Sequence, residues 1–534
     1  MKLFTLVFLA ILSAQGLSAQ ASDVQTIHDG QGWKLQVDGQ DFNVKGVVWS
    51  YTPIGENYTY DLWSQPDSVI RHTIDADMTL MKTMGVTTIR VFSTVPAKWI
   101  KYIYDQYGIY TMVNDLLGRY GVTVDGRWQF PTNYADPDTR KLLLAEARKT
   151  FETYKDTPGV LLYMLGNESN YGLDWSSAAT ENLPSGEANT LKAKALYSLF
   201  EQAIAEGKKI DPHHPFGIVN GDLGYLDLIK TLVPDLDILG VNTYRGPKSY
   251  AGFYNSIAKV LNKPFIYTEF GADAYNVGTE QEDQLDQAKL VESQWHEVYQ
   301  ESYGKGLAAN CLGGYVFEWM DEWWKNGMDT GLSTHDTQGT WNNGAYTFDA
   351  VPGKNNMNEE WFGLCAMSKK TQDGIPVRLP RMSYYALKDL WRLDLYTSSK
   401  EDIKKTFDNL KLDQGTEQAR AQALEFYDGT TDPHPILEVH GSFTSRAYLK
   451  GDDADWNKNG LSGLTAQTQT TTKLGAVIRT SEGLTGTLML RFLPNQVANN
   501  PIYDIADPVE SATLLSGNTT YVVQPVELYQ ATLR

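Results

Sequence analysis

The stretch VLLYML at residues 160–165 is apolar throughout and is followed directly by Gly166, Asn167 and Glu168. A short, continuous apolar run of this kind is typical of a strand buried on both faces, as in a parallel sheet covered by helices. Further along the chain, PFIY at residues 264–267 leads into Thr268 and Glu269 in the same manner. The two segments therefore predict two parallel strands, each with a glutamate at or just past its carboxyl end.

The chain contains eight such apolar runs, separated by segments with helical spacing. The helical segments include Asp75–Met84, closed by Gly85, as well as Thr139–Tyr154 and Ala188–Gly207. The eight runs are Asn43–Trp49, Val86–Phe92, Ile109–Asn114, Val160–Leu165, Phe216–Asn220, Leu236–Asn242, Pro264–Glu269 and Gly314–Trp319. Strands that alternate with helices in this number predict an α/β fold, a (β/α)8 TIM barrel.

The rest of the chain divides around this barrel, which we expect over residues 22–397. Residues 1–21 are typical of a signal peptide, with Lys2, an apolar run and an Ala-Gln-Ala site ending at Ala21. We therefore expect an exported protein, periplasmic or secreted, with no membrane span in the mature chain. A connector is expected at 398–434. Alternating runs in 435–534 predict a small C-terminal β-sandwich domain, for packing or for glycan binding.

Composition restricts the partners. A formal net charge of -19 disfavours nucleic acid and polyanions, whereas an aromatic content of 12% suits a neutral oligo- or polysaccharide. The two cysteines, Cys311 and Cys365, allow either a disulfide or two buried thiols. The segment Asp453–Gly460 has alternating oxygen ligands but lacks the later glutamate of a calcium loop, so we interpret it as a polar hairpin loop. No metal or cofactor is predicted, and the oligomeric state stays open.

Four segments resemble glycoside hydrolase family 2. They are YMLGNESNYG (163–172), TEFGAD (268–273), GGYVFEWMDEWW (313–324) and IPVRLPRMSYYALKDLW (375–391). They are similar to that family's acid/base segment, its nucleophile segment (especially in the β-glucuronidase branch), its eighth strand and its barrel exit. The likeness covers roughly residues 40–392. The family usually has two β-domains before the barrel, and we expect them to be lacking here.

The resemblance implies a role for each residue at the barrel mouth. Glu168 would be the general acid/base, Glu269 the nucleophile, and Asn167 a donor to the sugar 2-hydroxyl. Arg90, toward the end of the second run, and Tyr244, just after the sixth, are expected to support Glu269 by hydrogen bonds. Aromatic rings are expected to contact the sugars, with Trp319 as the floor of the site and, in the mouth loops, Trp49, Trp175, Trp323 and Trp324.

The predicted function is that of a retaining β-glycosidase acting on a neutral β-linked glycan, such as a β-glucan. Two alternatives remain open at this point. The same two glutamates would serve a transglycosylase that uses a sugar as acceptor. A barrel that has lost catalysis would be a glycan-binding protein.

Overall fold

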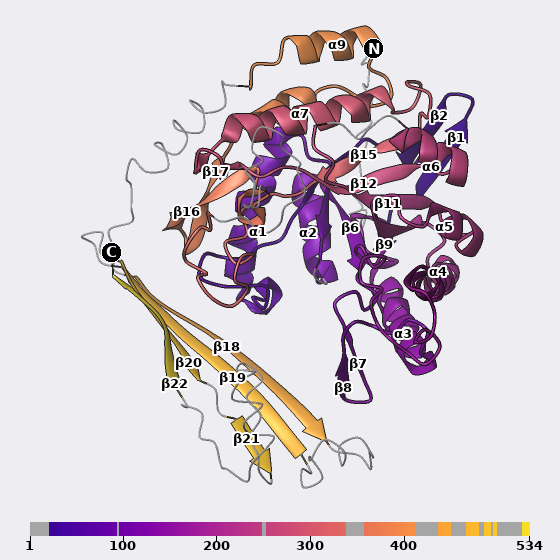
Figure 1. Cartoon of the computed structure of the whole chain (residues 1–534). Helices are drawn as coiled ribbons and strands as arrows, with labels where there is room; N and C mark the ends of the chain where they lie inside the picture. Colours follow the sequence, from indigo (N-terminus) through magenta and orange to yellow (C-terminus); the bar gives the residue numbers. More distant parts are fainter. Residues whose placement is uncertain are drawn as a thin grey trace, which may run out of the picture. The chain divides into compact units, whose positions relative to one another are not determined.

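The computed structural model describes residues 21–92, 95–247, 252–337 and 357–412 in full, and the backbone of five strands beyond them (Figure 1). The chain separates into two compact units, one up to Ala423 and the other chiefly Leu424–Arg534. The predicted signal peptide and the Asp453–Gly460 loop lie outside the described residues, apart from Ala21.

The first unit is a closed barrel of eight parallel strands in the order β10-β11-β12-β15-β4-β5-β6-β9. Every predicted run contributes one of these strands, so the predicted fold is confirmed. The strands are β4 (Val44–Val48), β5 (Thr88–Val91), β6 (Tyr110–Asp115), β9 (Val160–Leu165), β10 (Phe216–Gly221), β11 (Ile238–Asn242), β12 (Phe265–Phe270) and β15 (Cys311–Val316). The last strand ends three residues earlier than expected, at Val316 instead of Trp319.

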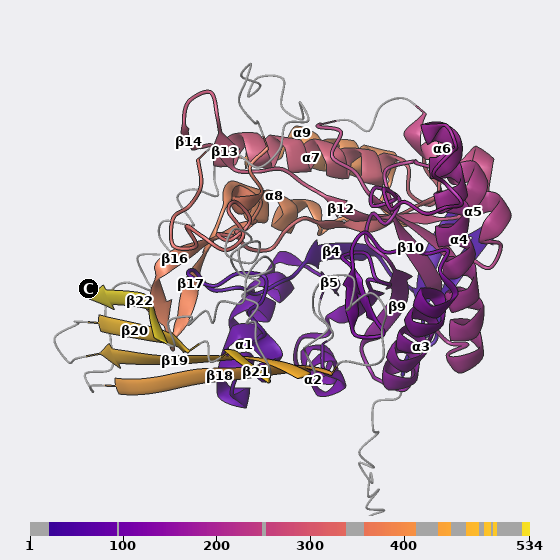
Figure 2. The same cartoon turned by 60° about the horizontal axis from the view of Figure 1, so that its bottom comes forward.

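Helices surround the barrel and follow the strands along the chain (Figures 1 and 2). They are α1 (Asp67–Met84), α2 (Ala97–Tyr107), α3 (Pro137–Tyr154), α4 (Ser185–Ile210), α5 (Leu226–Leu232), α6 (Phe253–Leu261), α7 (Gln284–Gln300), α8 (Met382–Leu390) and α9 (Lys400–Asp408). Gly85 ends α1 in the left-handed conformation (φ 99°), as a glycine after the last turn of a helix commonly does.

A small antiparallel sheet closes the amino-terminal end of the barrel. It consists of β1 (Val24–Asp29), β2 (Gly32–Val37) and β3 (Gln40–Asp41), with a turn at Asp38-Gly39, where both residues have positive φ. Val24 donates its backbone N–H to the carbonyl of His213, just before β10. Trp33 donates in the same way to Ala309, just before β15, so the opposite end of the barrel stays open for a site.

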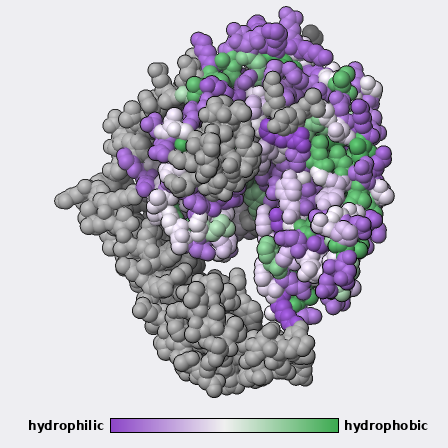
Figure 3. Space-filling model, viewed as in Figure 1, coloured by the Kyte–Doolittle hydropathy of each residue, from purple (hydrophilic) through white to green (hydrophobic). Residues whose placement is uncertain are grey.

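The loops at the carboxyl ends of the strands contain short elements. These are the 3-10 turns η1 (Leu62–Ser64) and η2 (Glu359–Trp361), and the strand pairs β7 (Val122–Val124) with β8 (Arg127–Gln129), β13 (Tyr275–Asn276) with β14 (Gln281–Glu282), and β16 (Cys365–Gln372) with β17 (Ile375–Pro380). Hydrophilic residues dominate the face of the barrel unit that Figure 3 shows, with smaller hydrophobic patches between them.

The predicted connector contains a helix that the sequence analysis missed. Ser399 caps the start of α9 in a capping box with Asp402. The helix packs on α7, where the ring of Phe407 stacks on that of His296 with centroids 4.5 Å apart. Ser-x-x-Asp before a charged helix is a start signal that was available in the sequence. The rest of the connector, residues 413–434, lies outside the described residues.

In the second unit, the described strands form one antiparallel sheet. They are β18 (Ile436–Leu449), β19 (Ala466–Arg479), β20 (Thr485–Phe492), β21 (Asn495–Ala498) and β22 (Val526–Leu533). A sandwich needs a second layer facing this one. The predicted β-sandwich therefore stays a prediction.

Two alternatives in the barrel unit are resolved. Cys311 and Cys365 are both buried, free thiols, so no disulfide links them. Among the described helices, none is long and apolar enough to cross a bilayer. In the same residues, no group of three or more His, Cys, Asp or Glu side chains is placed to hold a metal ion.

Candidate active site

Glu168 lies just past the end of β9, in a tight turn. Its backbone is left-handed (φ 50°), and its N–H donates to the carbonyl of Val219 on β10, at 3.1 Å. Burial, together with the negative charge of nearby Glu269, raises the pKa of the Glu168 carboxyl to about 7. A substantial fraction of Glu168 is therefore protonated near neutral pH and able to donate a proton.

Glu269 lies on β12 and is 6% exposed. Its Oε1 accepts a charge-assisted hydrogen bond from Arg90 Nη1 at 2.7 Å, and its Oε2 accepts one from the Tyr244 hydroxyl at 3.0 Å. Burial and the charge of Glu269 raise the pKa of Tyr244 well above its usual value, so the phenol keeps its proton and donates. Both groups donate to the Glu269 carboxylate and fix its orientation.

Asn167 connects the two glutamates through shared partners. Its Oδ1 accepts from Arg90 Nη2 at 2.7 Å and from Asn242 Nδ2 at 3.0 Å, while its Nδ2 donates to the Tyr120 hydroxyl at 2.9 Å. The structure thus brings Glu269, Asn167, Arg90 and Tyr244 together in one hydrogen-bonded group at the barrel mouth, with the Glu168 carboxyl near enough for the charges of Glu269 and Arg90 to influence its pKa.

Several members of this group were missed from the sequence. Asn114, at the end of β6, accepts from Arg90 Nε at 3.0 Å, and Asn242, at the end of β11, also hydrogen-bonds Glu168. Both residues end apolar runs, so their strand-end positions were an available signal. Tyr120 and Arg119 lie in a loop whose path no local pattern indicated. Arg119 Nε donates to the backbone carbonyl of Asn167 at 2.8 Å.

Trp319 and Trp49 do not lie where the sequence analysis expected. Both are buried, and their indole nitrogens donate to the two carboxylate oxygens of Asp77 on α1, at 2.8 and 3.0 Å. Arg378 on β17 also pairs with Asp77. These indoles pack between the barrel and α1 instead of flooring a sugar site. Phe317, and not Trp319, is the ring near Tyr244, at 6.3 Å.

The other predicted tryptophans differ in their exposure. Trp175 is 4% exposed beside Lys192 of α4, and Trp323 is 7% exposed and stacked on His335 at 4.4 Å. Neither offers an open face to a sugar, which corrects the expectation for both. Trp324 is half-buried beside Tyr58 at 5.7 Å, so for this residue sugar contact stays a prediction.

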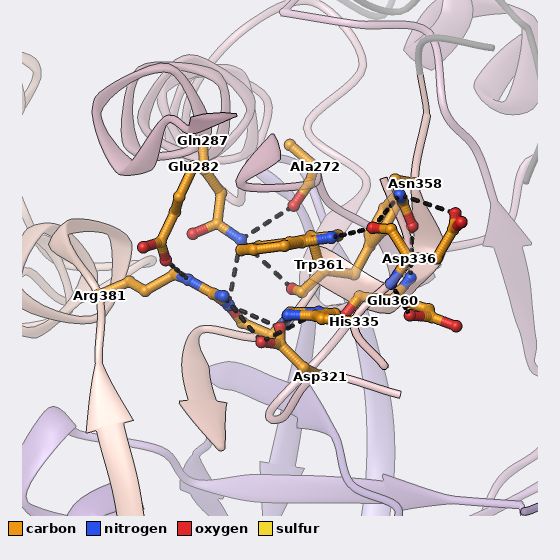
Figure 4. Close-up of polar contacts among 12 residues, drawn as sticks. Ala272, Glu282, Gln287, Asp321, His335, Asp336, Asn358, Glu360, Trp361 and Arg381 are labelled. Atoms are coloured by element: carbon orange, nitrogen blue, oxygen red, sulfur yellow. Dashed lines mark hydrogen bonds and ion pairs between the residues drawn. The ribbon is translucent and has the colours of Figure 1, made fainter. Parts of the chain in front are cut away.

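A polar cluster anchors the long segment that follows β15 (Figure 4). Arg381 forms a two-pronged ion pair with the buried Asp321, at 2.6 and 2.7 Å, and also binds Glu282. The His335 ring stacks on Trp361 at 3.6 Å, and its Nε2 lies 2.8 Å from the Glu360 carbonyl oxygen. Burial lowers the pKa of His335 to about 3, so the stacked ring stays neutral. The described parts of the segment, 317–337 and 357–364, are therefore fixed beside the mouth.

Carboxylates from this segment border the site on the side of β15 and β4. Ser50 lies just after β4. Its hydroxyl oxygen is 3.3 Å from a carboxyl oxygen of Glu318 and 3.3 Å from one of Glu322. Lys325 pairs with Glu322 at 3.1 Å and with Glu359 at 2.8 Å. Burial and the charge of Glu322 raise the pKa of Glu318 well above its usual value. This side of the mouth is acidic, with one lysine shared between two carboxylates.

A family comparison agrees with this geometry. Residues 67–359 match the family described as "Glycosyl hydrolases family 2, TIM barrel domain". The chain belongs to glycosyl hydrolase family 2. The matched range contains Arg90, Asn167, Glu168, Tyr244 and Glu269, so the hydrogen-bonded group at the mouth is part of the family 2 domain.

Individual relatives of this family 2 chain are distant. The 1,3-beta-glucanosyltransferase gel2 of Aspergillus fumigatus is 24% identical over 327 residues, which are 57% of this chain and 60% of that protein. Among solved structures, a GH2 beta-galacturonidase from Eisenbergiella tayi is 16% identical (TM-score 0.44, 70% of this chain and 55% of that one). A beta-D-glucuronidase from Dictyoglomus thermophilum is 17% identical (TM-score 0.43, 70% and 55%). The chain thus spans about 60% of the length of the curated relative it matches.

Proposed function

We propose that the chain is a retaining β-glycosidase, with Glu168 as general acid/base and Glu269 as nucleophile. The observation that carries this proposal is that the two neighbouring carboxyl groups lie in different electrostatic environments. The pKa of Glu168 is raised to about 7, while Arg90 and Tyr244 donate hydrogen bonds to Glu269. A protonated acid beside an ionised carboxylate is what double displacement at an anomeric carbon requires.

The reaction proceeds in two balanced steps. In the first step, a Glu269 carboxylate oxygen bonds to the anomeric carbon, and Glu168 gives its proton to the departing glycosidic oxygen. In the second step, Glu168, now ionised, takes a proton from the incoming hydroxyl, whose oxygen displaces Glu269. Asn167 is placed to donate to the sugar 2-hydroxyl while Arg90 and Asn242 fix its amide.

The proposed substrate is a neutral β-linked glycan, with a β-glucan favoured. The net charge of -19 disfavours a uronate, and Lys325 at the mouth is already paired with Glu322 and Glu359. The relation to a protein named as a 1,3-beta-glucanosyltransferase supports glucose in β-1,3 linkage. We also propose export through residues 1–21, which rests on the sequence alone.

A transglycosylase is the second candidate, and the gel2 relation is the observation that favours it. The two candidates share every step except the identity of the incoming hydroxyl. Mass analysis of products from a β-1,3-glucan oligosaccharide separates them. Only shortened chains indicate a hydrolase, whereas lengthened chains indicate transfer.

Replacing the nucleophile tests the proposal directly. Glu269→Gln should lower kcat on an aryl β-glucoside by at least about 10³-fold. In Glu168→Ala, azide should restore turnover and give a β-glycosyl azide, because the anion needs no general base. Unchanged turnover in Glu269→Gln would end the catalytic assignment, whereas an unmodified protein that binds a β-glucan without turnover would favour the glycan-binding alternative.

A further inference from the structure

Several aromatic side chains on the mouth loops are more than half exposed, and three of them contact residues that place them beside the site. These three are Tyr120 at 52%, Trp128 at 65% and Tyr171 at 59%. Tyr120 and Trp128 belong to the segment between β6 and α3, and Tyr171 belongs to the segment between β9 and α4. Single exposed rings need no explanation, but a group of them beside a site indicates a binding surface.

Two of these rings adjoin the proposed acid/base. The Tyr120 hydroxyl accepts from Asn167, the residue before Glu168, at 2.9 Å. Tyr171 donates its backbone N–H to the carbonyl of Glu168 at 2.9 Å. Both residues are therefore hydrogen-bonded to the segment that contains the proposed acid/base.

Two glycines allow the rings to lie against backbone. A Cβ atom at Gly121 would collide with the Trp128 ring, and one at Gly221 would collide with the Tyr171 ring. Trp128 is the middle residue of β8, which pairs with β7 next to Gly121. The rings are thus held in place from the backbone side before any ligand binds, which lowers the entropy cost of binding.

The position of Glu168 indicates on which side of the scissile bond these exposed rings lie. A general acid must lie on the side of the leaving group, and the same carboxylate later activates the acceptor from that side. In the barrel order, β6, β9 and β10 are consecutive, so the Tyr120 loop and the Tyr171 ring over Gly221 flank Glu168. The nucleophile and Tyr244 belong to β12 and the end of β11, farther around the mouth.

We propose that Tyr120, Trp128 and Tyr171 form the acceptor subsites, where the leaving or incoming part of a neutral β-glucan chain stacks its apolar sugar faces. This inference rests on the proposed function and adds the binding residues on one side of the scissile bond. Flat rings with polar edges bind pyranose faces without charge, in agreement with a neutral chain.

The test compares two substrates in Trp128→Ala and Tyr171→Ala. A β-1,3-linked glucose hexasaccharide places several sugars on the acceptor side, whereas an aryl β-glucoside places only its single leaving ring there. We expect kcat/KM for the hexasaccharide to fall about tenfold in each variant, the size of one lost aromatic contact, and that for the aryl glucoside to change less than about twofold. Trp128→Phe and Tyr171→Phe keep a flat ring and should retain most of the hexasaccharide activity.

Leu307→Ala is the matched control, since Leu307 is 89% exposed and follows α7 at the opposite end of the barrel. It should affect neither substrate. Three outcomes would each overturn the acceptor assignment. They are equal losses on both substrates, no loss on either substrate, and an unmodified enzyme that cleaves only the aryl glucoside. If Glu269→Gln leaves aryl glucoside turnover intact, the proposed function itself fails, and that result is separate from these.

Discussion

At the scale of single residues, the active site depends on a buried arginine. Arg90 is fully buried and donates to Glu269, Asn167, Asn114 and the Thr268 carbonyl, at 2.7 to 3.0 Å. A buried guanidinium is stable only when its donors and its charge are matched. Arg90 therefore fixes the orientation of the Glu269 carboxylate and of the Asn167 amide at the same time.

Replacing Arg90 should be costly for both stability and catalysis. Arg90→Ala leaves Glu269 buried without its cation, so we expect a loss of about 3–5 kcal/mol in the free energy of unfolding. We also expect kcat to fall by more than about 10²-fold on an aryl β-glucoside. Arg148→Ala is the control, because that arginine pairs with Glu206 at the surface and should contribute less than about 1 kcal/mol. Similar melting curves for the two variants would contradict this account.

The raised pKa of Glu168 predicts the alkaline side of the pH profile. The first step needs the protonated carboxyl, and its pKa of about 7 lies above the usual value near 4.5. As pH rises through about 7, the acid loses its proton, so kcat/KM should fall. In Glu168→Gln this descending limb should vanish on an aryl glycoside with a good leaving group. A pH–rate series on both proteins checks this, and a limb that persists in the variant would assign it to another residue.

At the scale of elements, Asp77 of α1 joins the helix to the ends of three strands. It accepts from Trp49 after β4, from Trp319 after β15 and from Arg378 on β17. The carboxylate is fully buried, so these donors satisfy a group that would otherwise be expensive to bury. The contacts assign the two tryptophans to packing between the barrel and its helices.

This assignment predicts that replacing Asp77 or Trp319 lowers stability, and that replacing Trp319 has little effect on catalysis. Asp77→Asn should lower the free energy of unfolding by about 3–5 kcal/mol, because Arg378 loses its buried counter-charge. Trp319→Phe should cost about 1–3 kcal/mol and change kcat/KM less than about threefold. Chemical denaturation and kinetics on an aryl β-glucoside provide the measurements. A drop of tenfold or more in kcat/KM with unchanged stability would restore Trp319 to the sugar site.

At the scale of the whole molecule, the barrel unit has its own core and its own site. Buried residues from all eight strands and from the surrounding helices pack together, and α9 adds Ile403 and Phe407 to that core. Neither Glu168 nor any of the four residues in the hydrogen-bonded group at the mouth comes from the second unit. Folding and chemistry should therefore both survive without the C-terminal sheet.

Truncation after residue 412 tests this independence. The shortened chain should melt cooperatively and keep kcat/KM for an aryl β-glucoside within about threefold, since every residue of the proposed machinery is retained. Circular dichroism melting and steady-state kinetics are the measurements. An insoluble product, or an inactive but folded one, would show that the second unit contributes to the barrel or to its site.

The sequence by itself determined the barrel and most of the catalytic group. Eight apolar runs with polar residues at their ends are a local pattern, and parallel strands bring those ends to one mouth, so Glu168, Glu269 and Arg90 could be placed together in advance. Asn167 and Tyr244 followed from their neighbours in sequence.

Only the tertiary structure decided which aromatic rings face the mouth and which are buried. A tryptophan has the same apolar character in a core as on a sugar platform, and its direction depends on where the strand ends. Trp319, three residues past the end of β15, is buried beside Asp77. Tyr120 and Trp128 gained their places from contacts with Asn167 and Gly121, which depend on loop paths that no local pattern determines.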